Sequence, residues 1–217
     1  DASAHADWLP RAFVEAQQDI SWIFRGIEGA DGVPDERKSA EATAFRARAY
    51  LNASEPRHAL EHADHAHVAS LEAGWDDILI TSTIWRAMAK QMLGEVGADV
   101  DIEAANALTL ATSTPLQPYT YTSLAFVLST QRRLSEALEM LNRANSLTPH
   151  DRAFELQHRS RLAVLMGDWP TVLEHGPAAM QALEDVGHIQ AMTSVTEYVA
   201  EAHRKQGALA EAKALLT

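Results

Sequence analysis

The stretch RHALEHADHAH, residues 57–67, holds the densest group of side chains that could perform chemistry. His58, Glu61 and His62 follow the spacing H-x-x-E-H, the inverted form of a zinc-protease signature. His65 continues the series at i, i+4 and i+7, a spacing that lets side chains converge on one face of a helix. A metal-dependent hydrolase is therefore one hypothesis.

The rest of the sequence offers no second catalytic constellation, since it lacks both G-x-S-x-G and a Gly-rich phosphate-binding loop that ends in Lys-Ser/Thr. The chain has no Cys, which removes thiolate nucleophiles and Cys-ligated zinc and favours a reducing, cytoplasmic compartment. Its net charge of −12 repels nucleic acid and anionic lipid, so we expect neither nucleic acid nor membrane as a partner. No apolar run approaches a membrane span.

The elements that must position these residues are helices. Ala-rich segments with helical spacing run almost from end to end, and strand signals are scarce. Ser54 and Asp168 are expected to cap helices, each with a proline in the first turn. The sequence predicts an all-α chain of about ten or eleven helices, with further starts expected at Asp35, Asp76, Asp99 and Asp151.

Short motifs recur along these helices. RHALEHADHAH and SEALEMLNRAN share Ala-Leu-Glu and a second alanine seven positions after the first. Around the second copy the pattern extends to Tyr121, Leu124, Ala125, Leu128, Ala137, Leu141, Ala144 and Pro149. It resembles the tetratricopeptide repeat (TPR), W-x2-L-G-x2-Y…A-x3-F…P. Weaker copies lie near residue 40, Trp85, Gly167 and Gly207, and the copy before Gly167 departs from the pattern at Arg159 and Ser160.

The resemblance implies an all-α, right-handed superhelical solenoid of antiparallel helix pairs over residues 35–217, with about five pairs and a truncated last one. Its longer repeats are similar to those of large ATP-dependent bacterial transcription regulators of the maltose-activator type. Residues 1–30 carry an apolar stripe and are expected to form a capping or partner helix. Because the chain does not begin with Met and the last pair stops early, we expect a piece of a longer array.

The same repeat register bears on the hypothesis of a metal site at the histidines. It turns Ala59, Ala63 and Ala66 towards the core, so His58, His62 and His65 lie on the outer face. A catalytic zinc needs a further ligand and a walled cavity with an open position, which an outer helix face does not offer. We therefore expect no catalytic residues, no metal and no cofactor.

In the TPR family the first helix of each pair lines a concave groove that binds extended peptides or partner helices. The resemblance places eight residues of this chain in that groove: Arg48, Arg86, Lys90, Tyr119, Thr122, Phe126, Gln157 and Arg161. Four of them are cations, which predicts a protein or peptide partner with acidic groups. The alternative is that these cations pair with neighbouring carboxylates of the same chain.

The sequence thus favours a non-catalytic protein- or peptide-interaction module, acting as a sensor or scaffold segment of a larger bacterial regulatory protein. Two alternatives stay open. One is the hydrolase that uses His58, Glu61, His62 and His65. The other is a structural oligomerisation module, with self-association through the N-terminal helix or the chain ends.

Overall fold

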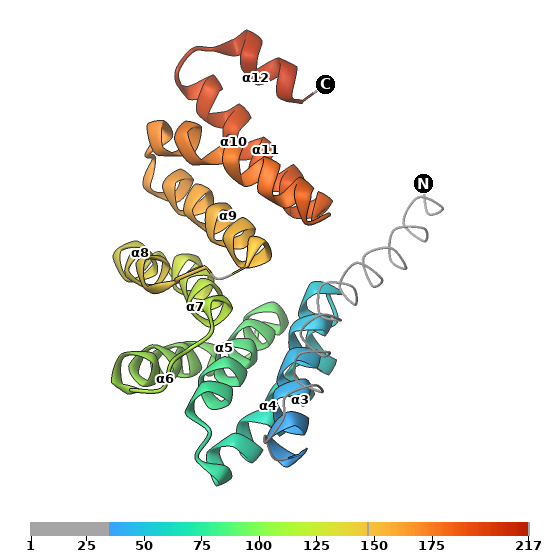
Figure 1. Cartoon of the computed structure of the whole chain (residues 1–217). Helices are drawn as coiled ribbons and strands as arrows, with labels where there is room; N and C mark the ends of the chain where they lie inside the picture. The colour runs from blue at the N-terminus through green and yellow to red at the C-terminus, as the bar shows by residue number, and fades with distance from the viewer. Residues whose placement is uncertain (1–34, 147, 217) are drawn as a thin grey trace. The chain divides into compact units, whose positions relative to one another are not determined.

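The computed structural model describes residues 35–146 and 148–216, and in these residues the backbone forms ten helices and no strand (Figure 1). The expected helix within residues 1–30 lies outside them. The chain divides into two compact units, residues 1–115 and 116–217, which are described separately. None of the described helices combines the length and the apolar character that a bilayer span requires.

Among the described helices of the first unit, each packs against the next, and the first of them also contacts the third. Its helices are α3 (Asp35–Asn52), α4 (Pro56–Ala73), α5 (Asp76–Leu93) and α6 (Ala98–Ala111). Short connections reverse the chain, so α3/α4 and α5/α6 are antiparallel pairs (Figure 1). Phe45 and Trp85 meet edge to face in the core with ring centroids 5.3 Å apart. Three alanines of α4 are fully buried, as their register predicts: Ala59, Ala63 and Ala66.

The second unit repeats this arrangement with three antiparallel pairs. Its helices are α7 (Pro118–Thr130), α8 (Leu134–Arg143), α9 (Pro149–Met166), α10 (Trp169–Asp185), α11 (Ile189–Lys205) and α12 (Leu209–Leu215). The first helices of successive pairs also touch, α7 against α9 and α9 against α11. The core between α9, α10 and α11 is built largely from small and β-branched side chains, among them Ala153, Val172, Ala179, Val195 and Val199.

The expected helix caps are correct at one position and wrong at another. Asp168 caps α10, and one of its carboxylate oxygens accepts a hydrogen bond from the Thr171 backbone N–H. Ser54 does not cap α4, because it adopts a left-handed conformation with φ 59° and the N-cap residue is Glu55. Pro56 still occupies the first turn of that helix.

The departure from the repeat at Arg159 and Ser160 has a physical reason in the short α8, which ends at Arg143. The Arg159 guanidinium donates from Nη2 to the Leu141 carbonyl at 2.9 Å and from Nε to Glu155 at 2.9 Å. It thereby satisfies a carbonyl in the last turn of α8, where intrahelical donors are missing. Ser160 is fully buried, but its hydroxyl donates to the Leu156 carbonyl at 3.0 Å, so no polar group is left without a partner.

Helix α10 approaches α11 so closely at Gly176 that a Cβ there would overlap the Val199 Cγ2 methyl. We therefore expect Gly176→Ala to lower the free energy of unfolding by about 2 kcal/mol, the cost of overpacking a tight contact. Adding Val199→Ala should make room, so the double variant should lose less stability than the sum of the two single changes. Urea denaturation measures all three, and strict additivity would contradict the close approach.

Candidate functional site

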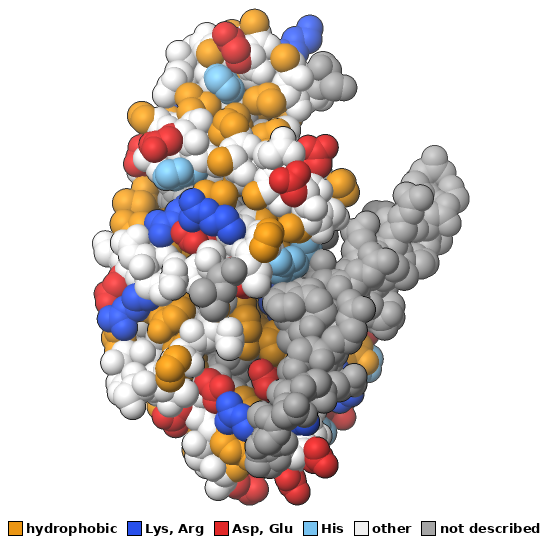
Figure 2. Space-filling model, in the orientation of Figure 1, with side chains coloured by type: hydrophobic (Ala, Val, Ile, Leu, Met, Phe, Trp, Pro, Cys, Tyr) orange, Lys and Arg blue, Asp and Glu red, His pale blue; other side chains and the backbone are white. Residues whose placement is uncertain are grey.

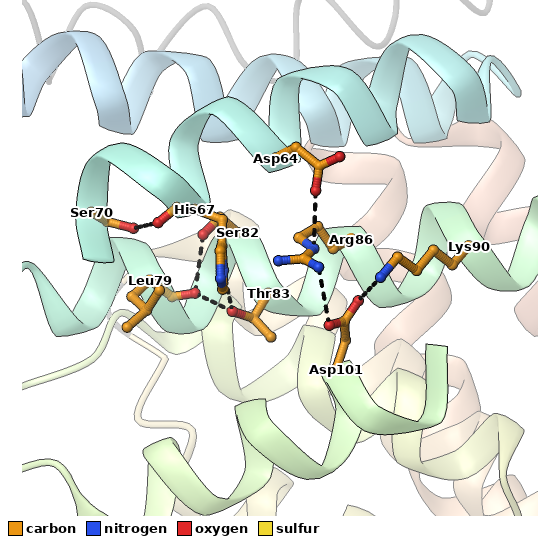
Figure 3. Close-up of polar contacts among 9 residues, drawn as sticks. All are labelled: Asp64, His67, Ser70, Leu79, Ser82, Thr83, Arg86, Lys90 and Asp101. Atoms are coloured by element: carbon orange, nitrogen blue, oxygen red, sulfur yellow. Dashed lines mark hydrogen bonds and ion pairs between the residues drawn. The ribbon is translucent and has the colours of Figure 1, made fainter. Parts of the chain in front are cut away.

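Two of the predicted groove cations, Arg86 and Lys90, lie one turn apart on α5 and are paired within the chain (Figure 3). Lys90 Nζ donates to Asp101 Oδ2 at 2.8 Å, and Arg86 Nη2 lies 3.4 Å from Asp101 Oδ1. Arg86 Nε lies 3.1 Å from Asp64 Oδ1. The two carboxylates come from the second helices of their pairs, α4 and α6. For Arg86 and Lys90, pairing with neighbouring carboxylates is therefore what the structure shows.

His67 adjoins this ion cluster and bonds across from α4 to α5 (Figure 3). Thr83 Oγ1 donates its single proton to the Leu79 carbonyl at 2.6 Å, so in the 3.0 Å contact with His67 Nδ1 it is the imidazole that donates. Burial and, next, the positive charge of Arg86 lower the pKa of His67, while Asp101 acts in the opposite direction. His67 was not singled out from the sequence.

The histidine cluster lies on α4 against the end of α3. His58 and His65 are exposed, and His62 is half-buried. The Tyr50 ring lies between two of them, stacked on His62 at 5.2 Å and tilted against His58 at 5.2 Å. His58 Nδ1 lies 2.9 Å from Glu55 Oε2.

A surface cavity of about 510 Å³ lies beside the cluster, between α3 and α4. Of the cluster only His65 lines it, with Asp35, Glu36, Ser39, Ala40, Thr43, Ala66 and Ala69. In residues 35–146 and 148–216, no set of three or more His, Cys, Asp or Glu side chains is placed to hold a metal ion.

The second unit brings aromatic rings together across its first helices. On α9, His150, Phe154 and His158 follow one another at spacings of four and so share one helix face. Phe154 meets His188, which precedes α11, edge to face at 4.7 Å, and His158 lies 5.7 Å from Phe126 of α7. We call this surface of Phe126, His150, Phe154, His158 and His188 the aromatic face.

Arg161 continues the aromatic face one turn further along α9. Its guanidinium lies over the Phe126 ring at 4.3 Å, a cation–π geometry, and Nη1 donates to Ser129 Oγ at 2.6 Å. The Tyr198 side chain of α11 stabilises its charged form. Burial raises the pKa of Tyr198, so its hydroxyl keeps its proton at neutral pH. Burial lowers the pKa of Arg161, but an arginine guanidinium stays charged in proteins.

The remaining predicted groove residues are less prominent. Thr122 is only 4% exposed, and its hydroxyl donates to the Tyr119 carbonyl at 3.1 Å. Gln157 lies one turn before Arg161, and among the described residues no donor reaches its buried Oε1 atom. Arg48 and Tyr119 are half-buried, Arg48 on α3 of the first unit and Tyr119 on α7 of the second.

Sequence reasoning identified Phe126 and Arg161 but missed most of the aromatic face. A signal was present in HDRAFELQHRSR, residues 150–161, where His150, Phe154, His158 and Arg161 repeat at spacings of four, four and three. That stripe is mixed in polarity, so a search for apolar periodicity does not detect it.

Asp101 is the carboxylate that Arg86 and Lys90 share, and its side chain is 10% exposed. We expect Asp101→Asn to lower the free energy of unfolding by about 2 kcal/mol, because half-buried Lys90 loses its counter-charge and Arg86 keeps only that of Asp64. Asp99→Asn is the matched control, since Asp99 shares the first turn of α6 but is exposed. Equal losses in urea denaturation of the two variants would show that only the helix dipole matters.

The lowered pKa of His67 predicts a pH dependence of stability. A histidine that is harder to protonate when folded binds more protons when unfolded, so its contribution to stability is complete above the unfolded pKa and is lost as the pH falls below about 6.5. His67→Gln should therefore reduce the loss of stability between about pH 7.5 and pH 5.5. Some dependence should remain, because burial also lowers the pKa of His62. Chemical denaturation at the two pH values measures this, and an unchanged difference would contradict the assignment.

No family model and no curated protein matches the chain. Solved structures that are similar to it include two of TPR-like repeats of a putative kinesin light chain from Podosopora anserina. The Q17M variant aligns with a TM-score of 0.59 and 17% identity over 85% of this chain and 94% of that one. The other aligns with a TM-score of 0.57 and 18% identity over 84% and 94%. At this identity the likeness establishes the fold alone: the chain has a TPR-like fold, a helical solenoid of antiparallel pairs, as its repeat pattern predicted.

Proposed function

We propose that the chain is a non-catalytic protein-interaction module that binds a peptide segment of its partner on the aromatic face. The observation that carries the proposal is the aromatic face itself. It extends over α7, α9 and the start of α11, and all five of its side chains are half-buried rather than packed in the core. First helices of helix pairs are the elements that repeat proteins of this architecture use for binding.

Aromatic side chains suit this role because they bury large apolar areas at little cost in conformational entropy and dominate the energetics of interfaces. Phe126 and Phe154 are the anchors that we assign. Arg161 adds a cation at the edge of the same surface, which favours a partner segment with acidic groups. Arg86 and Lys90 contribute less to such a partner, since Asp64 and Asp101 already compensate their charges.

The metal-dependent hydrolase is the weaker proposal. Of its four residues, His58, Glu61 and His65 are exposed on α4. The Tyr50 ring contacts His58 and His62, and Glu55 lies at hydrogen-bonding distance from His58. A hydrolytic zinc site needs a set of ligands around an open position. A binding role needs only the shape and chemistry of the aromatic face.

The wider setting of the module follows from sequence resemblance alone. The longer repeats are similar to those of large bacterial transcription regulators, so we propose a cytoplasmic sensor or scaffold segment of such a regulator. In that setting, peptide binding on the aromatic face would report on, or recruit, a partner protein.

Selection from a random peptide display library against the whole chain tests this function. We expect a family of related peptides to be enriched, and Phe126→Ala and Phe154→Ala each to weaken their binding about tenfold or more, as for buried aromatic anchors. Leu138→Ala is the control, because Leu138 is an exposed apolar side chain of the second helix α8. Its affinity should change less than about twofold. Thermal melting would verify that each variant is folded.

Two outcomes would contradict the proposal. One is the absence of any enriched peptide family. The other is enrichment of peptides that bind the two phenylalanine variants as tightly as the unchanged chain, which would place binding elsewhere.

A further inference from the structure

We infer that Arg161 and Arg132 form an anion site at the edge of the aromatic face, which takes a doubly charged group of a bound peptide. The group is either a phosphorylated side chain or two adjacent carboxylates. The inference rests on the proposed function, because the peptide is the one that the aromatic face would bind, and it adds the chemistry of recognition.

The Arg161 guanidinium is already oriented by its neighbours, and it has donors available for such a group. The contact of the guanidinium with the Phe126 ring and the bond from Nη1 to Ser129 Oγ together restrict its orientation. An arginine has five N–H donors, so most of them stay available after these contacts. A planar, pre-oriented fork is the geometry that binds carboxylate or phosphate oxygens through parallel hydrogen bonds.

Neither arginine has a counter-ion in the described part of the chain. No carboxylate of residues 35–146 or 148–216 lies within ion-pair distance of either, whereas carboxylates pair with seven other arginines: Arg37, Arg86, Arg133, Arg143, Arg152, Arg159 and Arg204. Acidic side chains outnumber basic ones by 30 to 18, and Figure 2 shows both kinds interspersed over one face of the chain. A half-buried guanidinium without a carboxylate is therefore an exception, and its desolvation is offset only by dipoles and a ring.

Arg132 and Arg161 are linked through Ser129, whose carbonyl accepts from the Arg132 backbone N–H and whose hydroxyl accepts from the Arg161 guanidinium. The turn between α7 and α8 carries Arg132 in a left-handed conformation with φ 62°, and its backbone N–H donates to the Ser129 carbonyl at 3.2 Å. The positive charge of Arg132 contributes to lowering the pKa of Arg161, as expected of neighbouring like charges. The two charges repel one another, and an anion bound by both guanidinium groups relieves that repulsion.

The donors and charges match a doubly charged group better than a single carboxylate. Two guanidinium groups supply two positive charges, and the Tyr198 hydroxyl keeps its proton and can donate a further hydrogen bond. A phosphate monoester carries up to two negative charges near neutral pH, as do two adjacent carboxylates. The charge of Glu197 also raises the pKa of Tyr198, and this carboxylate is exposed and not paired with Arg161.

The test uses the ¹⁵N-labelled whole chain and follows the Nε–Hε signals of Arg161 and Arg132 by NMR at fixed ionic strength. The probes are three acetylated and amidated peptides of the form Ala-Phe-Ala-X-X-Ala, where X-X is phosphoserine-Ala, Glu-Glu or Gln-Gln, and inorganic phosphate alone. We expect saturable shifts of both arginine signals with the phosphoserine or the Glu-Glu peptide, and affinity about tenfold lower or worse for Gln-Gln. The tighter of the two acidic peptides identifies the source of the charge.

Variants complete the test. Arg161→Gln and Arg132→Gln should each weaken the better acidic peptide about tenfold. Arg143→Gln makes the same change in net charge at an exposed arginine paired with Glu139, and should weaken it less than about twofold. Arg161→Lys keeps the charge without the planar fork and should give an intermediate loss, which guards against a folding defect in the glutamine variant. Glu197→Gln should strengthen binding.

Three results would overturn the inference: equal affinity for the Gln-Gln peptide, equal effects of the Arg143 and Arg161 variants, or binding of inorganic phosphate as tight as that of the phosphopeptide. If peptides still bind and depend on Phe126, only the anion site fails. If no peptide, neutral or acidic, depends on Phe126 or Phe154, the proposed function fails with it.

Discussion

The close approach of neighbouring helices is the constraint on which the rest of the structure depends. Ala59, Ala63 and Ala66 are fully buried on α4, and Gly176 of α10 lies directly against Val199 of α11. Small residues at these positions let backbones pack where a larger side chain would overlap. Because each pair contacts only its neighbours, this local rule, repeated, builds each unit without any long-range element.

In a fold of this kind, only one side of the first helix of a pair has to pack in the core. On α9 one side supplies core residues such as Ala153 and Ala163, while His150, Phe154 and His158 lie between helices and are only half-buried. These side chains can vary in chemistry without disturbing the alanine contacts. The proposed binding surface accordingly lies on the side of the helices where close packing does not require small residues.

The sequence was sufficient for the features that the packing rule controls. It predicted the all-α fold, the buried alanine stripe of α4 and the Asp168 cap, since each follows from residue type at a fixed spacing. It was insufficient where the rotation of a helix about its axis matters. Arg86 and Lys90 share a helix face at i and i+4, but α4 and α6 decide what that face meets. Ser54 has the chemistry of a cap, yet the backbone turns through a left-handed conformation there and Glu55 takes the position.

Charge compensation then separates cations that support the fold from cations that are free to bind. Asp101 is buried and accepts from Lys90, so removing the carboxylate would leave the Lys90 ammonium half-buried without its counter-charge. Arg159 likewise joins Glu155 to the end of α8. Arg161, two positions further along α9, is instead held by a ring and a hydroxyl group, which orient a guanidinium without neutralising it. In a chain with a large excess of carboxylates, a cation that is oriented but not neutralised retains its attraction for an external anion. We therefore assign a structural role to Arg159 and a role in recognition to Arg161, although both are arginines of α9.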